Sequence, residues 1–120
     1  MGLDNFWYVG SEDDPQEVIV PFDPPLHLIG GIFSGHGNGS FRGKVYAGVI
    51  EAVSGVSIYD DQDNATVKRI ADALDDYTGN PYEQLKEWNF TQEEAEAHFK
   101  DLQRMFRAYA DRGAWLHAWW

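Results

Sequence analysis

The two ends of this 120-residue chain are its most aromatic segments, and both have the composition of β-strands. Leu3 to Val9 reads LDNFWYV, and Gly10 with Ser11 closes it. The last seven residues, AWLHAWW, alternate two sets of side chains: Leu116, Ala118 and Trp120 on one side, Trp115, His117 and Trp119 on the other. Because a sheet this apolar needs a cover, the sequence predicts an α+β fold. Its small, mostly antiparallel sheet would include both terminal strands and be covered by about three helices.

Helical spacing of apolar residues, with signals at the ends, marks the expected helices. The first helix spans 44–53 and ends at Gly55. The second begins at Asp63 or Asn64 and ends at Thr78–Pro81. The third begins with the capping box Thr91/Glu94 and ends at Gly113. Residues 82–88 are expected to add a helical turn.

Three short strands are also expected, at Glu17–Val20, Leu26–Gly31 and Val56–Tyr59. Pro21, Pro24 and Pro25 remove backbone donors, so the region around them is predicted to be an extended connection at most.

Length and composition predict a single domain over residues 1–120, with 43% hydrophobic residues available for its core. The chain has no cysteine and no apolar run of about 18 residues, so a cytoplasmic location without a membrane span is expected. The net charge of −11 disfavours binding to nucleic-acid backbone or to an anionic membrane. This acidity is typical of a solvated surface tuned for high salt, or of a decoy that imitates DNA.

The segment from Gly30 to Lys44 is the candidate functional site. Seven of the twelve glycines fall between Gly30 and Gly48, and no carboxylate lies between Asp23 and Glu51. Glycines let the main chain approach a ligand, while hydroxyl, amide and guanidinium groups bind anions. The expected ligand-binding residues are Ser34, His36, Asn38, Gly39, Ser40, Arg42 and Lys44.

These features predict a non-enzymatic domain that binds a small anion or nucleotide and carries no cofactor. The segment matches neither the P-loop nor the dinucleotide pattern, since Asn38 and Val45 break the first and Ser40 and Arg42 break the second. The alternative is a long connection in which Arg42 bridges to a carboxylate.

Catalytic and metal sites have weaker signals. Four histidines, His27, His36, His98 and His117, match no compact ligand spacing with Asp23, so no metal is expected. Asp60–Asp63 lacks the glycine and distal glutamate of a calcium loop and is expected to be a solvated turn. An enzyme of unrecognised type would need Ser34, His36 and Arg42 to converge in a cleft.

The aromatic ends offer a second functional surface. Tryptophans in both terminal strands are expected to pack in the core, or else to contact a protein partner. The alternative function is therefore a protein-interaction module, such as an acidic viral inhibitor of a host factor. The terminal strands can also pair across a two-fold axis in a homodimer.

Three blocks carry a resemblance: the opening MGLDNFW, the central GGIFSGHGNGSFRGKVY and the closing FRAYADRGAWLHAWW. Together they resemble small uncharacterised proteins of prokaryotes and their viruses. The resemblance covers most of the chain and implies no activity or catalytic residue.

Overall fold

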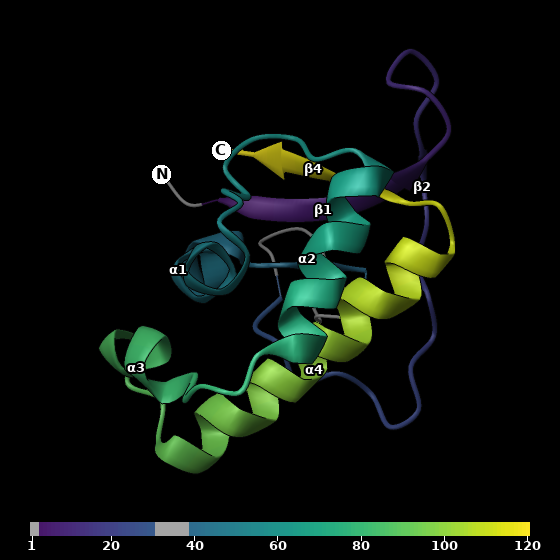
Figure 1. Cartoon of the computed structure of the whole chain (residues 1–120). Helices are drawn as coiled ribbons and strands as arrows, with labels where there is room; N and C mark the ends of the chain where they lie inside the picture. Colours follow the sequence, from purple (N-terminus) through teal and green to yellow (C-terminus); the bar gives the residue numbers. More distant parts are fainter. Residues whose placement is uncertain (1–2, 31–38) are drawn as a thin grey trace.

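The first strand is the centre of the sheet. The structure, a computed structural model, describes residues 3–30 and 39–120. In it, β1 (Asp4–Val9) pairs antiparallel with β4 (Trp115–Trp119) along one edge, as Figure 1 shows. The other edge of β1 pairs with two short strands, β2 (Gln16–Glu17) and β3 (Ser40–Phe41). The prediction that both terminal strands join one antiparallel sheet is confirmed.

The register of β1 with β4 divides the side chains between two faces. Trp7 lies opposite Leu116, and both are fully buried against the helices. Tyr8 lies opposite Trp115 and Phe6 opposite His117, all partly exposed on the other face. We call this second face the outer face of the sheet.

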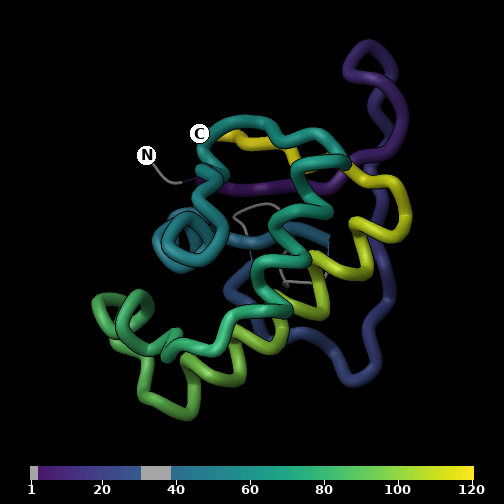
Figure 2. Tube along the Cα trace, in the orientation of Figure 1, coloured from purple at the N-terminus to yellow at the C-terminus, as the bar shows by residue number. Residues whose placement is uncertain are grey.

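Helices pack against this sheet, and the α+β class is confirmed. Within residues 3–30 and 39–120 there are four α-helices and one 3-10 turn: α1 (Gly43–Ser54), α2 (Asn64–Asp76), α3 (Tyr82–Leu85), η1 (Lys86–Trp88) and α4 (Gln92–Asp111). The expected cover of about three helices corresponds to α1, α2 and α4, with α3 as a short addition. α2 and α4 run side by side over one face of the sheet (Figures 1 and 2).

The predicted helix ends are confirmed by their caps. Asp63 Oδ1 accepts a hydrogen bond from Thr66 N at 2.8 Å at the start of α2. Thr91 and Glu94 form the reciprocal capping box of α4. Gly55, with φ +76°, ends α1 in the left-handed conformation that glycine adopts without steric cost.

The core lies between the sheet and the helices. Trp7 stacks on Tyr109 of α4 with ring centroids 4.5 Å apart. The Phe106 ring is nearly perpendicular to the Trp7 ring, with centroids 5.1 Å apart. On the surface above, Arg107 of α4 forms ion pairs with Asp72 and Asp75 of α2. Hydrogen bonds from Arg107 to these two carboxylates raise the pKa of its guanidinium. These exposed ion pairs join the two long helices at the surface and contribute little to stability.

The connection between β2 and the glycine-rich segment is extended, and side chains hold it in place. Its backbone N–H groups donate to α1 and α4: Val20 N to Tyr109 Oη at 2.9 Å, His27 N to Asp101 Oδ2 at 2.7 Å, and Ile29 N to Tyr46 Oη at 2.8 Å. The strand predicted at Leu26–Gly31 is wrong over its described part, because helix side chains satisfy these donors. The strand predicted at Glu17–Val20 is shifted and shortened to Gln16–Glu17.

The strand predicted at Val56–Tyr59 is also wrong. Asn5 Nδ2 of β1 donates to Ile58 O at 2.9 Å, so a side chain takes the place of a strand partner. The backbone pairing with β4 occurs four residues later, where Gln62 exchanges two hydrogen bonds with Leu116, both 2.9 Å long. Among the described helices, none is long and apolar enough to cross a membrane.

Candidate functional site

The predicted glycine-rich site is only partly within the described structure. Ser34, His36 and Asn38 lie outside the described residues, so their convergence with the rest is not tested. Gly39 immediately precedes β3, and Ser40 is its first residue. Arg42 is the N-cap residue of α1, and Lys44 lies in the first turn of that helix.

Two of the glycines are explained by packing rather than by a ligand. A Cβ on Gly43 would collide with Asn5 Oδ1 and lie 2.8 Å from Leu3 Cδ2. A Cβ on Gly39 would lie 2.7 Å from the flexible side chain of Ile19. Close approach of the chain to itself therefore accounts for glycine at both positions.

The first backbone donors of α1 are partly used within the protein. Arg42 N donates to Ile29 O at 2.9 Å, and Lys44 N donates to Leu3 O at 3.2 Å. Fewer N–H groups are thus available to an anion than a free helix N-terminus would offer. The Arg42 side chain forms no ion pair with any described residue, and the Lys44 ammonium lies 6.0 Å from the Trp88 ring centroid.

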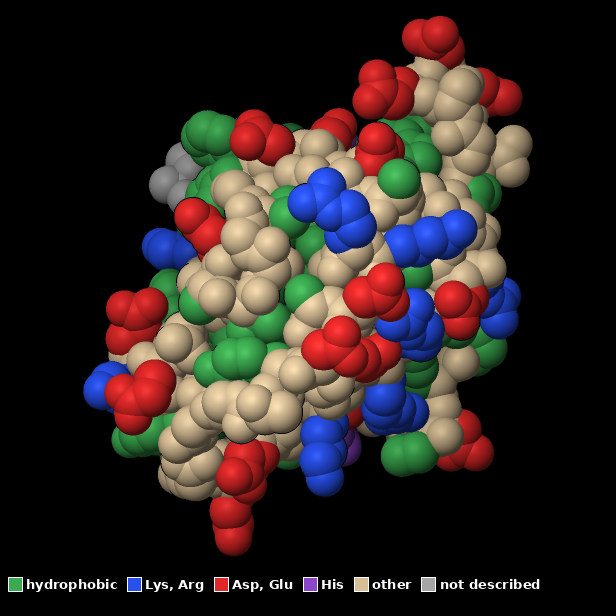
Figure 3. Space-filling view, in the orientation of Figure 1, with side chains coloured by type: hydrophobic (Ala, Val, Ile, Leu, Met, Phe, Trp, Pro, Cys, Tyr) green, Lys and Arg blue, Asp and Glu red, His purple; other side chains and the backbone are tan. Residues whose placement is uncertain are grey.

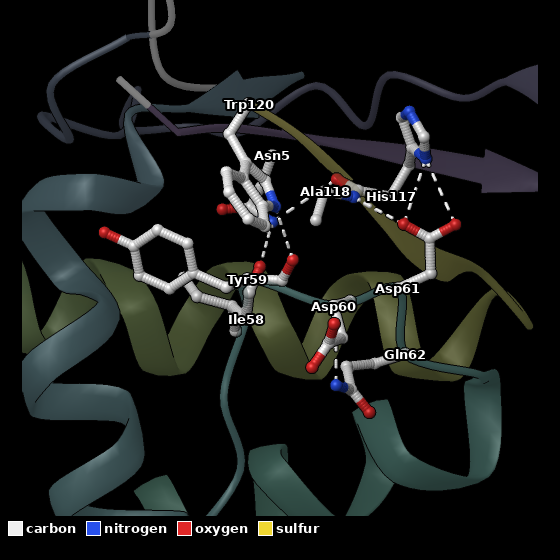
Figure 4. A network of polar contacts seen from close by, with 9 residues as sticks. All are labelled: Asn5, Ile58, Tyr59, Asp60, Asp61, Gln62, His117, Ala118 and Trp120. Atoms are coloured by element: carbon white, nitrogen blue, oxygen red, sulfur yellow. Dashed lines mark hydrogen bonds and ion pairs between the residues drawn. The ribbon is translucent and has the colours of Figure 1, made fainter. Parts of the chain in front are cut away.

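A second site emerges at the other edge of the sheet, where the segment from Ile58 to Gln62 runs along β4 (Figure 4). Asp61 makes side-chain contacts with two residues of β4. One carboxylate oxygen, Oδ1, accepts from Ala118 N at 2.7 Å and lies 3.0 Å from His117 Nδ1. The Trp120 indole N–H donates to Tyr59 O at 2.7 Å. The turn predicted at Asp60–Asp63 has exposed carboxylates, as expected, and in addition its Asp61 clasps β4.

Beside this clasp, aromatic rings of the outer face contact one another. Tyr8 lies 5.2 Å from Trp115 and 5.6 Å from His117, measured between ring centroids. Farther along the same face, Phe6 lies 6.2 Å from Trp119. Trp119 is 49% exposed and Trp120 is 64% exposed. We call these side chains, Phe6, Tyr8, Trp115, His117 and Trp119, the aromatic face.

The aromatic face borders two neighbouring hollows. The smaller, of about 240 Å³, is lined by Tyr8, Glu12, Pro15, Asp61, Trp115 and His117. The larger, of about 560 Å³, lies between the β1–β2 turn, the 61–66 segment and Gly113. The two share Glu12, Asp61 and Trp115, and neither is lined by a lysine or arginine among the described residues.

The charged side chains that line these hollows are acidic: Glu12, Asp61 and Asp63. Glu12, Asp13 and Asp14 are exposed on the projecting turn after β1, where Figure 3 shows acidic side chains at the upper right. Burial raises the pKa of the Tyr8 hydroxyl, and the nearby carboxylates of Glu17 and Asp61 raise it further. A cation would be favoured here and an anion disfavoured.

The arrangement has the groups for binding but an incomplete set for nucleophilic catalysis. Asp61 orients the His117 ring, which is one requirement of a general base. A hydrolase of the Ser-His-Asp type also needs a nucleophile within reach of that ring. The described residues lining the smaller hollow include no serine, threonine or cysteine.

Two of the histidines considered for a metal, His98 and His117, lie in separate surroundings, and His27 lies near enough to His98 to help lower its pKa. His98 of α4 lies 2.8 Å from Tyr46 Oη through Nδ1, while His117 pairs with Asp61 at the sheet. His36 lies outside the described residues. Within the described ranges, no three His, Cys, Asp or Glu side chains are grouped so that they could hold a metal ion.

Part of the outer-face site was visible in the sequence. The alternation of AWLHAWW places Trp115, His117 and Trp119 on one side, as the structure has them. The role of Asp61 was missed, because its partners lie more than fifty residues away along the chain. The sequence signal that could have found it is the combination of the acidic segment Asp60–Asp63 with a histidine in the terminal strand.

Comparisons with protein-family models, with curated proteins and with solved structures each returned no match. The resemblance to small prokaryotic and viral proteins therefore stays a prediction, and the function has to be argued from the residues themselves.

Proposed function

We propose that this protein is a binding domain whose aromatic face docks on a basic surface of a partner protein. The observation that carries the proposal is the contiguous group of partly exposed aromatic rings on the outer face, bordered by carboxylates. Aromatic side chains are enriched in protein interfaces, and exposed aromatic patches on a monomer mark contact sites.

The distribution of charge supports a basic partner. Lys and Arg are absent from 1–41, 45–67 and 113–120, the stretches that include β1, β2, β3, β4 and the Asp61 clasp. Five of the nine basic residues lie in α2 and α4, on the opposite side of the sheet. Charge complementarity therefore favours a cationic surface on the outer face and disfavours a second copy of this acidic chain.

A photo-crosslinking experiment tests this function. Trp119 is replaced by p-benzoylphenylalanine, and Ala97, an exposed residue of α4, is replaced in the same way as the control. We expect an adduct with one protein from position 119 and none from position 97, in cells producing the full chain. Binding of that purified protein should weaken as NaCl is raised.

Three results would count against the proposal. They are the absence of an adduct from position 119, equal adducts from both positions, and salt-independent binding of the captured protein. An adduct of twice the chain mass would show self-association through the aromatic face instead.

A second candidate function is the binding of a small anion or nucleotide next to Arg42. It is favoured by two observations: the Arg42 guanidinium has no carboxylate partner among the described residues, and Ser40 Oγ is buried without a hydrogen-bond partner there. A buried hydroxyl without a partner is unfavourable unless something binds it. The used N–H groups of Arg42 and Lys44 weaken this candidate relative to the first.

Thermal-shift measurements with inorganic phosphate and ATP test the anion site. The unfolding temperature should rise with one of them, and the rise should disappear in Arg42→Ala but persist in Lys68→Ala, which removes an exposed cation from α2. No shift with either ligand, or the same shift in both variants, would exclude this candidate.

A further inference from the structure

The smaller hollow beside the aromatic face has the features of a cation-binding pocket. Three of its walls are aromatic rings whose centroids lie within 6.2 Å of one another: Tyr8, Trp115 and His117. A cation placed over the Tyr8 or the Trp115 ring is attracted by the negative face of that ring. The pocket lies where β1, β4 and the projecting turn meet.

The walls are held in place before any ligand arrives. The Trp115 indole N–H donates to Gly10 O at 2.9 Å, which ties the ring to the turn after β1. His117 Nδ1 lies 3.0 Å from Asp61 Oδ1, and Ala118 N fixes the same carboxylate. Little side-chain ordering would therefore be needed on binding, and this favours affinity.

Two carboxylates supply the charge, in different ways. Asp61 already accepts from Ala118 N and lies beside His117, so it contributes its negative charge and its remaining lone pairs. Glu12 forms no hydrogen bond or ion pair with the described residues, and its side chain is on the exposed turn. Glu12 is thus the carboxylate available to pair with an incoming donor.

The size of the pocket indicates a side chain rather than a cofactor. Its volume of about 240 Å³ is below the roughly 300–1,000 Å³ of typical small-molecule sites. The adjoining hollow of about 560 Å³ shares Glu12, Asp61 and Trp115 with it, so neighbouring residues of a polypeptide would have room beside the pocket. Arginine suits the walls better than lysine, because the planar guanidinium both stacks on rings and pairs with a carboxylate.

We propose that the pocket formed by Tyr8, Trp115, His117, Glu12 and Asp61 receives an arginine side chain of the partner protein. The guanidinium stacks on the aromatic walls and pairs with Glu12. This inference rests on the proposed function, since it names the partner residue that the aromatic face recognises.

The test uses the purified full chain and two short peptides, Ac-Gly-Arg-Gly-NH₂ and its citrulline counterpart. Citrulline keeps the planar shape but loses the charge. In two-dimensional NMR titrations, the arginine peptide should shift the Trp115 indole N–H signal and bind about tenfold more tightly than the citrulline peptide. Equal affinity of the two peptides would overturn the proposal.

Variants locate the binding within the chain. Glu12→Gln should weaken the arginine peptide several-fold, whereas Glu87→Gln should leave it unchanged. Glu87 is an exposed carboxylate of η1, which adjoins α3 at the far end of the molecule from the projecting turn (Figure 1). Because Glu12 is exposed and makes no hydrogen bond or ion pair with the described residues, Glu12→Gln should leave the fold intact. Identical affinities in Glu12→Gln and Glu87→Gln would contradict the pocket.

This result is separable from that of the crosslinking experiment. Crosslinking from position 119 can succeed while the two peptides bind equally, in which case the docking function stands and the arginine pocket is wrong. Discrimination between the peptides without any crosslinked partner would support the pocket and contradict the docking function.

Discussion

A single buried amide, that of Asn5, joins three parts of the chain. Its Nδ2 donates to Ile58 O at 2.9 Å and to His117 O at 3.3 Å, and the side chain is fully buried. On its other side, Asn5 Oδ1 occupies the space that a side chain at Gly43 would need. The position of α1 relative to the sheet therefore depends on glycine at its first residue.

The two glycines of α1 should respond oppositely to alanine. Gly43→Ala forces a methyl group into Asn5 and Leu3, and should lower the free energy of unfolding by about 1–3 kcal/mol. A methyl group on Gly48, inside the helix, would meet no described residue beyond its own helix within 4 Å, so Gly48→Ala should raise that energy by up to about 1 kcal/mol. Urea denaturation of both variants measures the difference. Equal stabilities would refute the packing explanation for Gly43.

At the scale of elements, α4 organises much of the fold. Tyr109 and Asp101 of this helix accept hydrogen bonds from the extended connection after β2. His98 faces Tyr46 of α1 and lies 4.6 Å from the Phe90 ring. Burial lowers the pKa of His98, against the opposing effect of Asp101 and Glu94. Protonation of His98 should therefore weaken the contact between α4 and α1.

The pH dependence follows from the sign of that shift. The unfolded chain takes up a proton at His98 near the ordinary pKa of about 6.5, and the folded chain does so only at lower pH. Stability is thus fully present above about pH 6.5 and falls as pH drops toward the folded-state pKa. The urea midpoint should fall more steeply between about pH 7.5 and 5.5 in the native chain than in His98→Gln.

The comparison isolates His98 because the two proteins share every other side chain. The capping carboxylates Asp63 and Glu94 have lowered pKa values, so they titrate below this window. Parallel slopes in the two proteins would show that His98 does not couple to folding.

Which elements could be predicted depends on where their determinants lie in the chain. Caps are local, so the starts of α2 and α4 and the glycine end of α1 followed directly from Asp63, Thr91 and Gly55. The alternation of the terminal strands is local too. The failed strand at Val56–Tyr59 depends on Asn5, which is 53 residues from Ile58, and no periodicity in the segment itself records that partner.

The candidate sites also differ in how far their determinants are local in the sequence. The glycine-rich segment was identified by composition, yet Gly43 is needed for contact with Asn5 and Leu3, which composition does not show. The outer-face site requires the pairing of β1 with β4, which brings Tyr8 beside Trp115. Only the arrangement in space joins these residues to Asp61.

The whole molecule has an uneven charge. The chain has twenty acidic and nine basic residues, and the basic ones are concentrated in its second half. Figure 3 shows several of them gathered over the helices, while the projecting turn is acidic. Repulsion among the uncompensated carboxylates opposes the compact state.

Salt should therefore stabilise the protein. Raising NaCl from about 0.01 M to 0.3 M shortens the screening length from about 30 Å to below 10 Å, so long-range repulsion is lost. The surface ion pairs of Arg107 contribute little and lose little by comparison. The thermal midpoint measured by circular dichroism should rise over this range. A midpoint that falls would mean that attractive pairs outweigh the net charge of −11.

The central position of β1 also sets an order on assembly during translation. Its longest partner, β4, is made more than a hundred residues later, since Asn5 and His117 are 112 residues apart. While the ribosome adds the intervening helices, Trp7 has no Leu116 opposite it, and one edge of β1 stays unpaired. Pairing between such distant segments slows folding and prolongs the exposure of apolar surface in intermediates, so closure of the sheet depends on the residues of β4.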